Sequence, residues 1–219
     1  MKLIRVFFSK RDRAKYISHL DLTRTMTRAF ARTQIPVWFT EGFNPHIYMT
    51  FALPIPLGFE GLRESFDFKL LEDGFPMGEV RDQLNAALPP DIRVLEAAPA
   101  LDKPEAIAWA DYRVELYDKA GGAALRRDWE GLMARPSIPV VKKTKHREQE
   151  LDLRPLVTQL ELTEGEDSLA LALRLPAGPA MNLNPSLLLG ALWEARGGEA
   201  DYVRVLRTAI LREDFTPFA

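Results

Sequence analysis

Cysteine is absent from the sequence. Disulfides, thiolate zinc sites, iron–sulfur clusters and a cysteine nucleophile are therefore excluded within this chain. The sequence also has no apolar run near the roughly 20 residues that a membrane-spanning helix needs, and its first residues do not follow a signal-peptide pattern. We therefore expect a cytoplasmic protein that does not bind a membrane.

A large net charge is also missing, because the total is only −2. This excludes a chain that binds nucleic acid through overall basicity. The charge is nevertheless sorted along the sequence: residues 1–50 hold nine Lys and Arg against three acids, a net +6, and residues 51–100 hold four against nine, a net −5. Sorted charge can orient a partner molecule.

The apolar pattern predicts an α+β fold of two units. Residues 1–98 read as β-α-β-β-α-β, a proline-containing linker spans residues 98–106, and residues 107–219 repeat the order. We expect two tandem ferredoxin-like units with antiparallel sheets. In the first unit the expected strands are residues 1–9, 35–40, 47–53, 64–71 and 92–97, and the expected helices run from 19 to about 33 and from 76 to 88.

The first helix has a clear start and a clear apolar face. Ser18 and Asp21 form a capping box in which the Ser18 hydroxyl can accept the Asp21 amide proton. The side chains expected to face the core recur three and four residues apart and are Leu22, Met26, Ala29 and Phe30, with Leu20 beside them.

A row of arginines occupies another face of this helix. Arg24, Arg28 and Arg32 are four residues apart, and like charges at this spacing cost a helix about 0.2–0.5 kcal/mol per pair. The row therefore does not serve the helix itself. A bound polyanion would explain it, and an ordinary solvated face is the alternative.

Two of the three histidines flank this region. His19 lies at the first helical turn, where the helix dipole disfavours a second proton on the ring, and His46 closes the turn of residues 41–46. The pair could act as acid and base. With Asp21 or Glu41 it could instead bind a metal such as Zn²⁺, and two ordinary surface histidines are the third interpretation.

The second unit carries a compact basic segment. Its cations, in a predicted hairpin, are Lys142, Lys143, Lys145, His146 and Arg147. Such a patch is typical of phosphate binding, although lysines also protect an exposed edge strand. Three aromatic side chains, Phe7, Trp38 and Tyr48, could stack on RNA bases or could belong to the core.

Four separated motifs carry a resemblance to a known family: Ser18–Asp21 (SHLD), Gly42–His46 (GFNPH), residues 53–58, and Lys142–Lys145 followed by Asp152–Pro155 (DLRP). Over nearly its whole length the chain resembles the bacterial radical-SAM-linked family. This is a domain of unknown function found fused to, or encoded beside, radical SAM proteins with a B12-binding-type region. The resemblance implies an accessory role in RNA modification, with tRNA or rRNA as the candidate substrate.

The leading hypothesis is therefore an RNA-binding accessory protein that works with a separate radical SAM protein. Because this chain lacks cysteine, S-adenosylmethionine and the iron–sulfur cluster would belong to that partner, and no cofactor is expected here. The residues expected to contact RNA are Arg24, Arg28, Arg32, Asn44, Lys142, Lys143, Lys145 and Arg147. One alternative is a His19/His46 hydrolase or metal-binding enzyme, and the other is a protein-docking module that uses the acidic residues 60–96.

Overall fold

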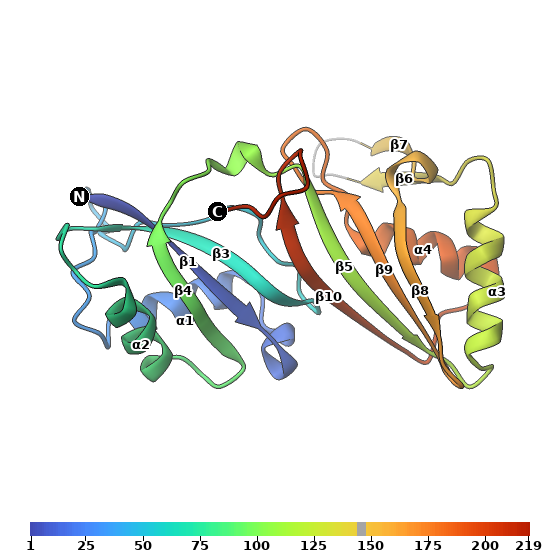
Figure 1. Ribbon diagram of the computed structural model, residues 1–219, viewed down its shortest axis with the longest axis horizontal. Helices are drawn as coiled ribbons and strands as arrows, with labels where there is room; N and C mark the ends of the chain where they lie inside the picture. The colour runs from blue at the N-terminus through green and yellow to red at the C-terminus, as the bar shows by residue number, and fades with distance from the viewer. Residues whose placement is uncertain (144–147) are drawn as a thin grey trace. The chain divides into compact units, whose positions relative to one another are not determined.

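The computed structural model describes residues 1–143 and 148–219 (Figure 1). These residues divide into two compact units. Unit 1 comprises residues 1–106, 207–210 and 217–219, and unit 2 comprises residues 107–206 and 211–216. Both units are mixed α+β structures, and the strand pairs within them are antiparallel.

Unit 1 combines two α-helices with a small antiparallel sheet. Strand β1 lies between β4 and β3, and β2 pairs with residues 66–68 of β3. In chain order its elements are β1 (Lys2–Lys10), η1 (Asp12–Tyr16), α1 (His19–Phe30), β2 (Met49–Phe51), β3 (Glu60–Leu70), α2 (Met77–Ala87), β4 (Ile92–Pro99) and the short η2 (Pro104–Ala106).

The core of unit 1 lies between α1 and one face of the sheet. Alternate residues of β1, among them Val6 and Phe8, point to this face and are fully buried, as the strand period of two requires. Phe30 of α1 packs on Phe66 and Phe68 of β3, with ring centroids 6.1 and 4.9 Å apart. The predicted strand at residues 1–9 is therefore confirmed.

Unit 2 has a four-stranded order of β10-β5-β9-β8, and β6 and β7 form a separate hairpin. Trp129 of α3 is buried in its core and donates its indole N–H to Gln159 at 2.6 Å. In chain order the elements are β5 (Trp109–Tyr117), α3 (Gly122–Met133), β6 (Pro139–Lys143), β7 (Glu148–Asp152), η3 (Arg154–Leu156), β8 (Thr158–Glu164), β9 (Ser168–Pro176), α4 (Pro185–Arg196) and β10 (Tyr202–Leu211).

The prediction of a strand at residues 35–40 is wrong. This segment makes only isolated bridges, at Val37 and Phe39. Pro36 has no N–H to donate, and the Val37 N–H turns back to the Ile35 carbonyl at 2.9 Å, so a continuous ladder cannot form. The strand expected at residues 47–53 is shortened to β2.

Two details of the first helix also differ from expectation. The α-helix ends at Phe30 because the Arg32 N–H bonds to Ala29, three residues back, and the turn tightens. Leu20 is 57% exposed and is not part of the core face. In the described part of the chain, we find no helix with both the length and the apolar character needed to cross a membrane.

Candidate functional site

The start of α1 is fixed as the sequence predicts. The Ser18 hydroxyl accepts the Asp21 N–H at 3.1 Å and donates to the Asp21 carboxylate at 2.7 Å. These bonds lower the pKa of Asp21, with the hydroxyl contact as the largest cause. The capped helix also buries Leu22 and Met26 completely, so the opposite face of α1 is directed away from the core.

The three arginines lie on the exposed part of α1 and the residues just after it. Arg24 makes one long contact with Asp21, 3.4 Å from nitrogen to oxygen. Arg32 donates to the carbonyl of Ala87 at the end of α2, at 3.2 Å. Arg28 makes no hydrogen bond or ion pair with the described residues. Arg24 and Arg28 are therefore available to an anion, whereas Arg32 partly holds two helices together.

His19 is exposed at the first turn of α1. Its ring meets the Phe51 ring edge-on, with the centroids 4.8 Å apart. Loss of hydration on burial against the Phe51 ring lowers the pKa of His19, and the positive charge of Lys10 lowers it further. The neutral form of the imidazole is therefore favoured, and this form can accept a hydrogen bond or a proton.

The buried amine of Lys10 lies near His19. This residue, at the end of β1, is only 1% exposed, and its ammonium donates to the carbonyls of Lys15 and Phe59 at 3.4 and 3.3 Å. Burial lowers the pKa of Lys10 to about 8, although the negative charge of Glu64 acts in the opposite direction. Such a lysine supplies positive charge beneath His19 without reaching solvent itself.

A buried ion pair completes this region. The guanidinium of Arg207 donates to both carboxylate oxygens of Glu64 and, at 2.7 Å, to the carbonyl of Leu53. Gly61 makes room for this pair, because a Cβ there would collide with the Glu64 side chain. Through these bonds, Arg207 and Glu64 hold β3 and the loop before it in one arrangement.

The turn of residues 40–46 is closed by its own polar groups. The Thr40 N–H donates to the His46 carbonyl at 2.8 Å, and His46 Nδ1 lies 3.1 Å from the Thr40 hydroxyl and 3.0 Å from the Asn44 carbonyl. Phe43 at the tip is fully exposed, and Asn44 is exposed beside it. The turn therefore presents an aromatic ring and an amide to solvent.

The two histidines have separate surroundings. His19 contacts Phe51, whereas His46 bonds within its own turn, and no hydrogen bond or ring contact joins them in the described structure. Asp21 is engaged by the Ser18 cap. Among the described residues, no three His, Asp or Glu side chains are gathered so that they could hold a metal ion. The four candidate ligands, which also include Glu41, do not form such a group.

The aromatic side chains proposed for stacking divide into two kinds. Phe7 is 4% exposed and belongs to the core. Trp38 and Tyr48 are half-buried, and the Lys69 ammonium lies 4.3 and 4.7 Å from the centroids of their rings. Since cation–π contacts already engage these two rings, only their outer parts are open to a partner.

The basic hairpin of unit 2 is described only in part. Lys142 donates to the carbonyl of Asn182 at 2.7 Å, and the backbone of Lys143 pairs with Glu148. Lys145 and Arg147 lie outside the described residues. In the DLRP motif, Asp152 accepts backbone N–H bonds from Ile138 and Arg154, at 2.7 and 3.0 Å, and these bonds lower its pKa. This motif therefore anchors the base of the hairpin.

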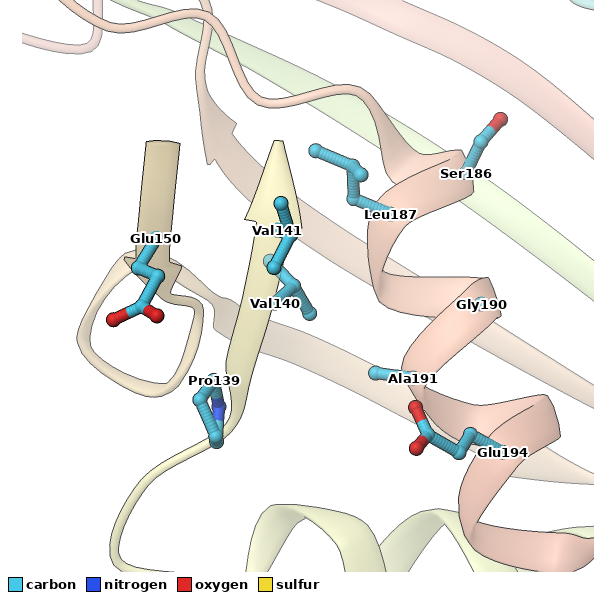
Figure 2. A pocket seen from close by; sticks show the side chains of 9 residues that line it. All are labelled: Pro139, Val140, Val141, Glu150, Ser186, Leu187, Gly190, Ala191 and Glu194. Atoms are coloured by element: carbon cyan, nitrogen blue, oxygen red, sulfur yellow. The ribbon is translucent and has the colours of Figure 1, made fainter. Parts of the chain in front are cut away.

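A groove of about 580 Å³ runs between this hairpin and α4 (Figure 2). Val141 and Leu187 contribute apolar walls, and Gly190 leaves the middle of the helix without a side chain. The acidic side chains of Glu150 and Glu194 lie at its edges. Because carboxylates repel phosphate, this groove is not a continuation of the basic patch.

Sequence reasoning missed the buried charges at Lys10, Glu64 and Arg207 and the exposed ring of Phe43. A signal for one of them exists, since Arg207 shares the strand alternation of the buried Val205 in β10. For Phe43, the neighbouring Gly42 and Asn44 indicate a turn tip, where a large apolar residue has little chance of burial.

A family model described as "Uncharacterized protein conserved in bacteria (DUF2344)" matches residues 3–185 of the chain. The comparison with curated proteins found no match. The matched segment includes the capped helix α1, the turn of residues 40–46 and the hairpin of unit 2. Because the match covers most of the sequence, the chain belongs to the DUF2344 family of bacterial proteins.

Proposed function

We propose that this protein binds structured RNA and works with a separate radical SAM enzyme in RNA modification. In this role it presents tRNA or rRNA to the enzyme, which carries the S-adenosylmethionine and the iron–sulfur cluster. The radical SAM partner is proposed from the sequence resemblance, and RNA is proposed from the surface of unit 1.

The observation that carries the proposal is the arginine row of α1. Arg24 and Arg28 project from one exposed face at a spacing that does not favour the helix. Arg28 makes no ion pair with the described residues, and Arg24 makes only a long one. Guanidinium groups that lack strong protein partners are well suited to phosphate oxygens.

The exposed turn supports the same proposal. Phe43 and Asn44 offer a stacking surface and hydrogen-bonding groups together, which is the combination that reads unpaired RNA bases. The neutral ring of His19 adds a second polar contact. The hairpin cations of unit 2, of which Lys142 and Lys143 lie in the described range, would add phosphate contacts.

We also propose that each unit is a ferredoxin-like module. Unit 1 has the order β-α-β-β-α-β, with β1 between β4 and β3. Unit 2 has the same order if the β6–β7 hairpin is treated as an insertion, with β5 between β10 and β9. Modules of this type bind RNA in other proteins, but the fold alone does not assign a function.

Crosslinking the protein to RNA in its native host, followed by sequencing, tests the proposal. We expect enrichment of one tRNA or rRNA region and its loss in the variant Arg24→Glu/Arg28→Glu. The matched control is Arg127→Glu/Arg135→Glu, which makes the same charge change at two exposed arginines of unit 2. Absence of enrichment, or equal loss in both variants, would contradict RNA binding through α1.

A further inference from the structure

A second cavity lies within unit 1, on the face of its sheet opposite the one that packs on α1. Phe7 and Ser65 are direct neighbours across β1 and β3, so their side chains share this face. The cavity measures about 280 Å³, just below the range of about 300–1,000 Å³ typical of ligand pockets. It therefore suits a single small ring rather than an extended molecule.

The walls of the cavity are mainly aromatic and aliphatic. The side chains that form them are Phe7, Ile210 and Phe218, and the polar groups among them are Arg63, Ser65 and Thr208. Ser65 is 3% exposed, and its hydroxyl has no hydrogen-bond partner among the described residues. A buried hydroxyl without a partner carries a desolvation cost, which a ligand in the cavity would remove.

The charge of Arg63 is already neutralised. Its guanidinium stacks on the Phe7 ring, 3.8 Å from the centroid, and donates to Glu96 at 2.9 Å. An anionic ligand would have to compete with this carboxylate. A neutral planar ligand would not, because it uses the apolar walls and the flat guanidinium without displacing the ion pair.

The chain segment that closes the cavity is firmly held. The Phe218 N–H donates to the Ile210 carbonyl at 3.0 Å, and the ring of Phe218 lies under the Arg5 guanidinium at 4.1 Å. Arg5 itself forms a buried double hydrogen bond with Asp67, at 2.7 and 2.8 Å. The cavity is thus preformed, which reduces the entropy lost when a ligand binds.

We propose that this cavity binds one uncharged planar heterocycle of the nucleobase class. The base lies among Phe7, Phe218 and the Arg63 guanidinium and takes a hydrogen bond from the Ser65 hydroxyl. Naming RNA as the source of the base rests on the proposed function. The cavity then holds a base that has left its stack, while the arginines of α1 hold phosphates.

Titration of the full chain with uncharged nucleosides tests the site directly. Adenosine, guanosine, cytidine and uridine are added to ¹⁵N-labelled protein, and the amide shifts of Ser65 and Thr208 are followed by NMR. We expect saturable shifts from at least one nucleoside, with an affinity that does not change with salt. Salt independence separates base binding from phosphate binding.

Two variants locate the binding. Ser65→Ala removes a hydroxyl that has no protein partner, so the fold is retained while nucleoside affinity falls about fivefold, the value of one ordinary hydrogen bond. Ala209→Leu fills the cavity and abolishes binding. Ser186→Ala, in the groove of unit 2, is the matched control and leaves the affinity unchanged.

Three results would overturn the proposal: no saturable shift with any nucleoside, equal binding by wild type and both cavity variants, or salt-dependent binding of nucleoside monophosphates alone. The last result would identify an anion site. Nucleoside binding without RNA crosslinking would support the cavity and contradict the proposed RNA function. RNA crosslinking without nucleoside binding would support the proposed RNA function and contradict the cavity.

Discussion

The two units differ in how deeply they bury charged side chains. In the described structure, every buried charged residue belongs to unit 1: Arg5, Lys10, Glu60, Glu64, Asp67 and Arg207. In unit 2, Asp111 and Arg174 form a comparable double hydrogen bond, but their side chains stay 18% and 20% exposed. Unit 2 thus keeps its ion pairs in contact with water.

This difference indicates where specialised structure is concentrated. Burying a charge costs free energy even when it is paired, so ordinary stability does not require the arrangement of unit 1. The two ion pairs Arg5–Asp67 and Arg207–Glu64 fix how the strands of unit 1 meet. Arg5 also contacts Phe218 in the wall of the cavity beside Phe7. Glu64 and Arg207 act on the charge of Lys10, which in turn acts on His19. We therefore expect function to reside in unit 1.

The largest expected effect comes from breaking the buried pair of unit 1. Glu64→Ala leaves the Arg207 guanidinium buried without its carboxylate, and the free energy of unfolding should fall by about 3–5 kcal/mol. Asp111→Ala in unit 2 is the matched control, and it should cost only about 1 kcal/mol because water reaches Arg174. Urea unfolding of both variants measures the difference.

The double variant Glu64→Leu/Arg207→Met removes both charges together. It should be more stable than Glu64→Ala because it does not leave the Arg207 guanidinium buried without its carboxylate. If Glu64→Ala and Asp111→Ala lowered stability equally, the contrast between the units would not hold.

A smaller effect is expected from the pH dependence of Lys10. Folding lowers its pKa from 10.5 to about 8, so between these values the unfolded chain keeps a proton that the folded protein has released. Raising the pH across this window therefore stabilises the fold through Lys10. The stability of the wild type relative to Lys10→Met should rise from pH 8 to 10.5, as measured by urea unfolding at each pH.

The exposed Lys2 provides the control for this measurement. Relative to Lys2→Met, the wild type should show much less change across the same window. A flat difference for Lys10→Met would mean that the amine is better hydrated than its burial indicates.

The smallest expected effect concerns His19. Contact with Phe51 and the charge of Lys10 both hold the pKa of His19 below its ordinary 6.5. Removing the charge in Lys10→Met should raise the pKa of His19, and NMR titration of its ring protons measures this. An unchanged titration in that variant would leave loss of hydration as the sole cause.

Local patterns allowed most elements to be predicted. The Ser18 capping box and the spacing of the apolar residues located α1, and the apolar pattern located β1 and most of β3. The ends of the elements were less predictable. The break at Pro36 and the tightened turn at the end of α1 depend on hydrogen bonds between neighbouring residues, which apolar periodicity does not indicate.

Buried ion pairs could not be predicted in the same way. Arg5 and Asp67 are 62 residues apart and Arg207 and Glu64 are 143 apart, so their pairing depends on the tertiary structure. For the candidate site, the sequence identified the exposed arginines but not the cavity, because Ser65 and Phe7 meet only when β1 and β3 pair. The histidine-based enzyme and the docking module remain predictions.

The salt dependence of RNA affinity tests the central claim most directly. Bulk tRNA from the native host is titrated with the wild type and with Arg24→Glu/Arg28→Glu at several salt concentrations. We expect affinity to fall linearly on a log–log plot, with a slope about two units shallower in the variant, one for each lost phosphate contact. An affinity that does not change with salt, or equal slopes for the two proteins, would contradict RNA binding by the arginines of α1.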